Sequence, residues 1–197
     1  MSDSALSDIK ILDLTSYVAG PYCTKLLADF GAEVVKVEKP GQGDPSRRVG
    51  PFPGDVPNPE KSGLFLHLNT SKRGITLDLK TPRGVSIFKE LLKDVDAVVE
   101  NFEPRVMRSL GLSYEELAAV NPRVIMTSIS NFGQTGPYRD FAATELTLFA
   151  MEGQMASLGS LGREPPYFGG AMSQYFAGNM AAVATMAGIT GARLQGV

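Results

Sequence analysis

Cysteine and histidine are almost absent from this sequence, which has one of each, Cys23 and His67. A single cysteine excludes an intramolecular disulfide framework, and one cysteine with one histidine does not supply the ligands of a Cys/His zinc site. We therefore expect no metal site and a reducing, cytoplasmic setting.

An excess of charge and a long apolar run are also missing. The 197 residues include 19 Lys and Arg against 21 Asp and Glu, a formal net charge of −2, so there is no electrostatic case for nucleic-acid binding. No apolar stretch reaches the roughly 18 residues that a membrane span needs, and the first residues, MSDSALSDIKI, lack the basic and apolar segments of a signal peptide. We expect neither a nucleic-acid nor a membrane partner.

The composition is that of a folded domain, with 43% hydrophobic and 20% charged residues. An apolar run at 9–14 predicts a strand, Pro21 suits the start of a helix that Gly31 ends, and residues 32–38 predict a second strand. The usual form of such a β-α-β unit is a parallel crossover. The pattern predicts an α/β fold.

The same alternation continues along the chain. We expect strands at 75–79, 96–100 and 123–130, a helix capped by Thr81-Pro82, a short helix with a Ser113/Glu116 capping box, a Met-rich helix at 144–157 and a small-residue helix at 174–188. Residues 39–63, rich in proline and glycine, predict a long functional or mobile loop. The final TGARLQGV resembles a turn leading onward.

Ligands of open parallel sheets bind outside the carboxyl ends of the strands, which singles out the loops at 15–20, 39–63, 101–108 and 131–140. The cations beside these loops are Lys36, Lys39, Lys72, Arg73, Lys80 and Arg105. Lys72-Arg73 can contact a phosphate, although charge alone favours a solvated surface pair. The first loop, TSYVAG, has one glycine and so lacks the G-x-G-x-x-G dinucleotide fingerprint.

Other reactive side chains have simple structural interpretations. We interpret His67 as a hydrogen-bonded core or boundary residue, and Cys23 as a small buried one. The methionines at 151, 155, 172, 180 and 186 are interpreted as core filling.

Four motifs together are far more specific than any of these features. They are ILDLTSYVAGPYCTKLLADFGAEVVKVEKPGQGD, NTSKRGITLDLKTPRG, VVENFEPRVMRSLGL and NPRVIMTSISNFGQTGPY. In this order and spacing they resemble the class III coenzyme A transferases, the formyl-CoA and carnitine-CoA transferase family. The resemblance implies that residues 1–197 form the N-terminal CoA-binding large domain, with a Rossmann-like parallel sheet that is incomplete here. It also implies that full-length subunits, about twice as long, interlock as a homodimer.

Site residues follow from the resemblance by motif. Coenzyme A or acyl-CoA is then a substrate, and no tightly bound cofactor is implied. The residues implied to line the CoA cleft are Ser16, Tyr17, Val18, Ala19, Lys39, Lys72, Arg73, Asn101, Phe102 and Val106. The resemblance therefore favours the interpretation of Lys72-Arg73 as a phosphate contact over its interpretation as a solvated surface pair.

Transferases of this family use an aspartate nucleophile that opens a D-x-x-A-G pattern, and here Gln174 occupies that position. An amide is a very poor nucleophile, so the covalent mechanism does not transfer unchanged. Glu145 is the candidate substitute base or nucleophile. The alternative interpretation, of equal weight, is that Glu145 is a charge favourably placed at a helix N-terminus. Thr144 and Gln174 stand where the family's racemases have His and Asp, which disfavours racemisation.

The leading hypothesis is an acyl-CoA:carboxylate CoA transferase of acyl-CoA metabolism, acting on an acyl-CoA and a free carboxylic acid, with Gln174 at the nucleophile position. The alternative is a non-catalytic CoA-binding half whose catalytic carboxylate comes from another domain or chain. A third hypothesis, dinucleotide binding without CoA, is weakened by the missing glycine fingerprint.

Overall fold

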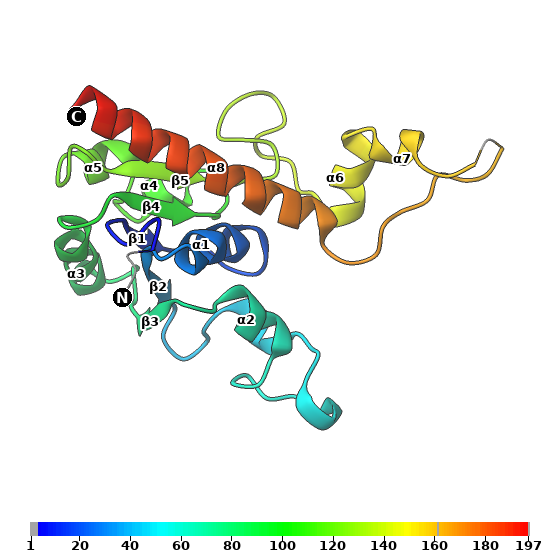
Figure 1. Cartoon of the computed structure of the whole chain (residues 1–197), viewed down its shortest axis with the longest axis horizontal. Coiled ribbons are helices and arrows are strands. Elements are labelled where there is room, and N and C mark those ends of the chain that lie inside the picture. Colours follow the sequence, from blue (N-terminus) through cyan, green and yellow to red (C-terminus); the bar gives the residue numbers. More distant parts are fainter. Residues whose placement is uncertain (1–3, 161, 197) are drawn as a thin grey trace.

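The computed structural model describes residues 4–160 and 162–196, and its centre is one parallel sheet (Figure 1). The strand order is β3-β2-β1-β4-β5, and every neighbouring pair is parallel. The strands are β1 (Lys10–Asp13), β2 (Glu33–Glu38), β3 (Arg73–Thr76), β4 (Ala97–Glu100) and β5 (Ile125–Ser128). The expected Rossmann-like sheet is confirmed, with the reversal of strand order between β1 and β4.

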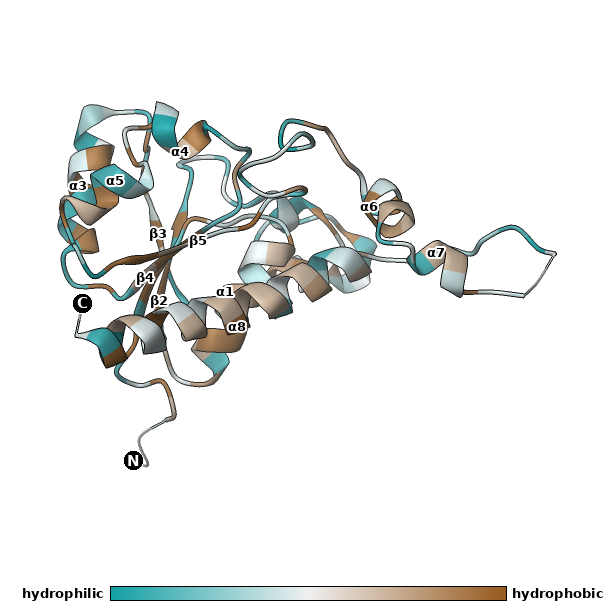
Figure 2. Ribbon diagram, turned by 90° about the horizontal axis from the view of Figure 1, so that it is seen from above, coloured by the Kyte–Doolittle hydropathy of each residue, from teal (hydrophilic) through white to brown (hydrophobic). Residues whose placement is uncertain are grey.

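Helices cover both faces of the sheet. One face carries α1 (Ala19–Asp29) and α8 (Met172–Gln195), and the other carries α3 (Pro82–Leu92), α4 (Val106–Ser109) and α5 (Tyr114–Ala118). Alternate residues of a strand point to opposite faces, so Ile11 joins the core under α1 and α8 whereas Leu12 joins the core under α3 and α5. Figure 2 shows the apolar strands between these layers.

Local signals explain most helix starts. The Thr81 hydroxyl accepts a hydrogen bond from the backbone N–H of Gly84 (3.0 Å) at the start of α3, and the Ser113/Glu116 capping box begins α5.

The expected helix at 144–157 is divided into α6 (Glu145–Met151) and α7 (Gln154–Ser157) because Gly153 has a φ of +80°. Both lie beyond the N-terminal end of α8 (Figure 1).

The 39–63 loop contains two short 3₁₀ helices, η1 (Pro45–Arg48) and η2 (Pro53–Asp55), and leads into α2 (Gly63–Leu68), which the sequence reading missed. Its signal was Ser62, whose hydroxyl accepts from the N–H of Phe65 (3.1 Å). His67 is exposed on α2, so its interpretation as a core or boundary residue is wrong.

Three further expectations need correction. β3 begins at Arg73, two residues before the expected strand, and α8 continues through TGARLQ, where a turn was expected. The core-filling interpretation is wrong for Met151, Met172 and Met180, which are exposed.

Cys23 is buried as expected, and burial raises the pKa of its thiol to about 12. Among the described residues, no helix has the length and apolar character needed to cross a membrane.

Candidate functional site

A cavity of about 310 Å³ lies at the carboxyl ends of the strands. Four segments line it: the residues after β1, the 39–63 loop after β2, the residues after β3, and those after β4. Four of the expected CoA-contacting residues are in its wall, namely Ser16, Lys39, Phe102 and Val106. This is the crevice where open parallel sheets bind their ligands.

The chemistry of the cavity combines apolar walls with cations. Val37, Leu77, Leu79 and Leu110 supply apolar surface, and Lys39, Arg48 and Lys80 supply exposed positive charge. The guanidinium of Arg48 donates to the backbone oxygen of Gln42 (2.7 Å). Such a site suits a ligand with a flat apolar part and anionic groups.

Sequence reasoning missed Arg48, although its position in an adjacent Arg pair was visible. Only the fold separates the two arginines: Arg47 binds the carboxylate of Glu38 through its Nε and Nη2 atoms (2.8 Å each) and stacks 3.6 Å from the centre of the Phe65 ring. Arg48 instead faces the cavity.

Asn101 connects the loops that follow β1 and β4. Its Nδ2 donates to the backbone oxygen of Ser16, and its Oδ1 accepts from the backbone N–H of Ser16, both at 2.8 Å. The amide is therefore used inside the protein, where it sets the separation of two cavity walls. A direct contact of Asn101 with CoA stays a prediction.

A buried ion pair between Lys36 and Asp44 fixes the loop that follows β1. Lys36 Nζ lies 2.8 Å from Asp44 Oδ2 and 2.9 Å from the backbone oxygen of Thr15, and Asp44 Oδ1 accepts from the backbone N–H of Tyr17 (3.1 Å). Burial acts to raise the pKa of Asp44, but the Lys36 ammonium and the Ser46 hydroxyl hold it below its ordinary value. Tyr17 is thereby kept at a φ of +71°, and the residue is 40% exposed.

Lys72 is a structural cation in this fold. Its Nζ contacts Asp13 Oδ2 (3.0 Å), the backbone oxygen of Pro21 (2.9 Å) and Asn69 Oδ1 (2.9 Å), which uses all three ammonium hydrogens, and the side chain is 1% exposed. Lys72 is thus not the solvated surface cation that charge alone favoured. Its saturated ammonium also argues against a phosphate contact.

Arg73 lies away from the cavity. It is the first residue of β3, at the amino end of the strand, and its exposed guanidinium pairs with Glu33 at the start of β2 (2.9 Å). The geometry therefore separates the two members of the Lys72-Arg73 pair and brings neither into the cavity wall.

The N-terminal turns of α8 and α1 are in close contact. A Cβ added to Gly178 would lie 2.4 Å from the backbone oxygen of Ala19, and the rings of Tyr22 and Tyr175 meet edge to face at 4.8 Å. Val18 and Ala19 are buried at this junction. Gln174, one helical turn before Gly178, is consequently placed beside the loop that runs from the cavity into α1.

Glu145 also lies at the start of α8. It begins α6, and its Oε1 accepts a hydrogen bond from the backbone N–H of Ser173. Its Oε2 is enclosed and has no partner among the described residues, and the same holds for the Ser173 hydroxyl. The fold therefore brings Glu145 and Gln174 to one place, with the glutamate acting as a cap for α8.

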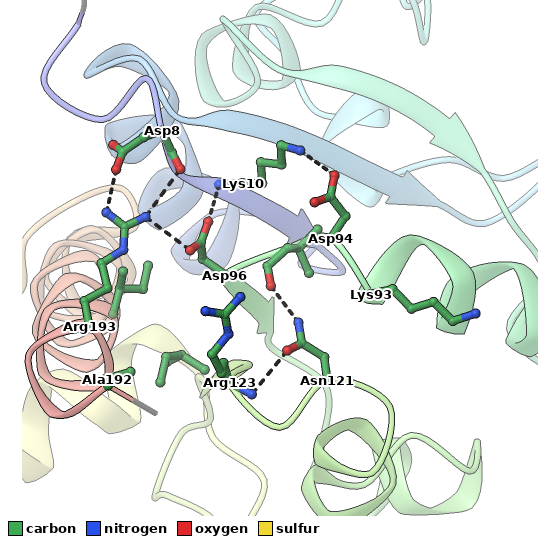
Figure 3. A pocket seen from close by; sticks show the side chains of 13 residues that line it. Asp8, Lys10, Lys93, Asp94, Asp96, Asn121, Arg123, Ala192 and Arg193 are labelled. Carbon is green, nitrogen blue, oxygen red and sulfur yellow. Dashed lines mark hydrogen bonds and ion pairs between the residues drawn. The ribbon is translucent and has the colours of Figure 1, made fainter.

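A larger cavity, of about 520 Å³, lies at the opposite, amino edge of the sheet (Figure 3). Several of its charges are paired: Arg193 of α8 pairs with Asp8 (2.6 Å) and Asp96 (3.2 Å), and Asp96 also accepts from the N–H of Lys10 (2.8 Å), whereas Arg123 has no ion pair among the described residues. This ion-pair network anchors the C-terminal turn of α8 to the sheet. The carboxyl-edge cavity is the candidate functional site, because ligands of open parallel sheets bind outside the carboxyl ends of the strands.

An open parallel sheet with helices on both faces and a cavity at its carboxyl edge defines a Rossmann-like α/β domain. The family model of CoA-transferase family III matches residues 6–197, and this chain belongs to that family.

Relatives share this assignment. The chain is 43% identical over 184 residues to succinyl-CoA--D-citramalate CoA-transferase of Chloroflexus aurantiacus, covering 92% of this chain and 44% of the relative. It is 48% identical over 136 residues to formyl-CoA:oxalate CoA-transferase of a Bradyrhizobium species, covering 69% and 31%.

A crystal structure of a CAIB/BAIF family protein from Brucella suis superimposes with a TM-score of 0.90 at 33% identity, covering 99% of this chain and 51% of that one. The chain thus spans about half the length of the proteins it matches, or less.

Proposed function

We propose that this chain forms the CoA-binding part of an enzyme that transfers coenzyme A from an acyl-CoA to a free carboxylic acid. One observation carries the proposal: the carboxyl-edge cavity joins apolar walls to three exposed cations, and the loop that leaves it runs into α1, whose first residue contacts the N-terminal turns of α8. Family membership and the names of the relatives, which transfer CoA from succinyl-CoA or formyl-CoA, support it.

In this proposal the adenosine part of CoA lies against Phe102, Val106 and Leu77, and its phosphates meet Lys39, Arg48 and Lys80. The pantetheine arm passes Ser16 and the Tyr17–Ala19 turn and brings the thioester to Gln174. Coenzyme A acts as a substrate and leaves as product. For the whole protein we propose a cytoplasmic homodimer with acyl-CoA and carboxylic acid as its small-molecule partners.

A second candidate function is a CoA-binding half that receives its catalytic carboxylate from another domain or chain. The absence of Asp and Glu from the 24 residues of α8 favours it. It predicts that the wild-type chain binds CoA and carries out no transfer.

The binding proposal is tested by calorimetric titration of free CoA into the wild type and Lys80→Glu. Lys80 is exposed, so its charge can be reversed without loss of a buried contact. Loss of a charge-assisted hydrogen bond costs about 1.5–3 kcal/mol, which predicts a Kd weaker by about 10–150-fold.

Lys61→Glu is the matched control, because Lys61 is an exposed lysine that does not line the cavity. Equal Kd values for Lys80→Glu and Lys61→Glu would contradict the placement of the phosphates. A folded wild type that fails to bind CoA would contradict the function itself.

A further inference from the structure

Two walls of the carboxyl-edge cavity are joined to each other by buried side chains. Thr15 and Ser16, after β1, form part of one wall, and the 39–63 loop, which includes Asp44, forms part of another. Lys36 Nζ bridges them, because it lies 2.9 Å from the backbone oxygen of Thr15 and 2.8 Å from Asp44 Oδ2. The shape of one wall therefore depends on the position of the other.

Asp44 makes a second bond between these walls, to Tyr17, the residue after Ser16. Its Oδ1 accepts from the backbone N–H of Tyr17 (3.1 Å), which has a φ of +71°, a conformation that costs a tyrosine free energy and that glycine adopts freely. Asp44 is itself fixed, since its own N–H donates to Glu38 Oε2 at the end of β2 (2.7 Å). A firmly held acceptor thus keeps Tyr17 in a conformation that tyrosine does not prefer.

The carboxylate of Asp44 is occupied inside the protein. The residue belongs to the cavity wall, but its side chain is only 1% exposed. Oδ1 also accepts from the N–H (2.8 Å) and the hydroxyl (2.7 Å) of Ser46. A carboxylate repels a phosphate rather than binding it. A contribution of Asp44 to the binding of an anionic ligand must therefore act through the residues that it holds.

We propose that Asp44 is a positioning residue of the CoA site, which ties the loop after β1 to the 39–63 loop and holds Tyr17 in the left-handed conformation, without touching coenzyme A. This inference rests on the CoA-binding function proposed above and names what keeps two walls of that site in place. Without the bond from Asp44, Tyr17 relaxes towards a negative φ. Only the fraction of molecules that keeps the wild-type loop then binds CoA with full affinity.

The test is a double-mutant cycle, read by calorimetric titration of free CoA into the wild type, Asp44→Ala, Tyr17→Gly and the double variant. With tyrosine at position 17, Asp44→Ala should weaken the Kd by about 10-fold, which is in the range that backbone strain of this kind produces. With Tyr17→Gly in place, the same change should weaken the Kd by less than about 2-fold, because glycine adopts a positive φ without cost. Whatever the Tyr17 ring contributes to binding cancels, since each comparison is made with residue 17 unchanged.

The sign of the effect separates positioning from electrostatics. Removing a negative charge from a site that binds phosphates strengthens binding where charge alone acts, whereas loss of the bond to Tyr17 weakens it. Asp55→Ala is the matched control, because Asp55 is an exposed aspartate of the same 39–63 loop that does not line the cavity. It should leave the Kd unchanged, with tyrosine or with glycine at position 17.

A second pair of variants removes both buried charges together, so that neither variant leaves Lys36 without its anion. Lys36→Met combined with Asp44→Asn retains a carbonyl oxygen for the N–H of Tyr17, and Lys36→Met combined with Asp44→Leu removes that oxygen at a similar volume. We expect the first variant to bind CoA at least about 5-fold more tightly than the second. This pair decides the question where Asp44→Ala fails to fold.

Three results would overturn the inference. They are an equal loss of affinity for Asp44→Ala with either residue at position 17, a Kd for Asp44→Ala that is unchanged or tighter, and equal affinities for the two Lys36→Met variants. A folded wild type that fails to bind CoA would instead remove the proposed function, and the inference with it, which distinguishes the two failures.

Discussion

Replacing Lys72 with methionine should destabilise this protein strongly, because it leaves a buried carboxylate without its direct ion-pair partner. Asp13 is fully buried, and its Oδ2 lies 3.0 Å from Lys72 Nζ. Burial alone would raise the pKa of Asp13, yet Lys72, Lys36 and the hydroxyls of Thr15 and Thr24 lower it to about 2. Breaking a buried pair by removing one partner costs about 3–5 kcal/mol, and we expect Lys72→Met to lose that amount.

The pH dependence of stability provides a second readout. A carboxylate whose pKa is lowered from 3.8 to about 2 on folding contributes stability that is complete above about pH 5 and is lost as the pH falls through 2. At neutral pH this contribution is about 2.5 kcal/mol. In Lys72→Met the carboxyl loses its main cation, so the fall in stability between pH 5 and pH 2 should become shallower than in the wild type.

Urea unfolding followed by circular dichroism at pH 7 and pH 3 measures both effects. Lys61→Met is the control, because Lys61 is an exposed lysine with no ion pair among the described residues. Asp13→Asn combined with Lys72→Met removes both charges and should recover part of the loss. If Lys72→Met unfolds within about 1 kcal/mol of the wild type, the buried pair does not have the role assigned to it.

Two more outcomes follow from buried groups near the site. Burial raises the pKa of Glu100, whose Oε2 accepts from the N–H of Phe102 (2.7 Å), so ionisation costs stability as the pH rises above its ordinary value near 4.5. Glu100→Gln keeps a hydrogen-bond acceptor and removes the ionisable group, so it should raise Tm at pH 7 by about 2–4 °C, the shift that about 1 kcal/mol produces in a chain of this length. At pH 4 it should give no gain. A lower Tm at pH 7 would count against this reasoning. Gly178→Ala places a Cβ 2.4 Å from the Ala19 oxygen and should cost about 1–3 kcal/mol in urea unfolding, whereas Gly191→Ala, with open space around it, should be neutral or slightly stabilising. Equal stability of these two glycine variants would show that α1 and α8 are not in tight contact.

Much of the fold was predictable because its signals act over a few residues. The strands at 9–14 and 32–38 and the capped helices beginning after Thr81 and Ser113 correspond closely to β1, β2, α3 and α5. Strand alternation, helical spacing and hydrogen bonds from a cap to the next turn depend on neighbours in the sequence. The short helix α2 was missed because its six residues are too few to show a helical period.

The site was predictable only in part. The rule that ligands bind at the carboxyl ends of parallel strands located the cavity, and motif resemblance identified Ser16, Lys39, Phe102 and Val106 in its wall. Neither approach distinguished Arg48 from Arg47, whose environments differ because only Arg47 reaches Glu38.

The sequence by itself determined the α/β class, the family and the loops that line the candidate cavity. Tertiary structure alone decided which charged groups remain free for a ligand. Lys72 meets Asp13 across 59 positions of the chain, and Glu145 meets Ser173 across 28. Such pairs form only when packing brings distant elements together, and once formed they consume the donors and acceptors that a residue's type would otherwise offer to a ligand.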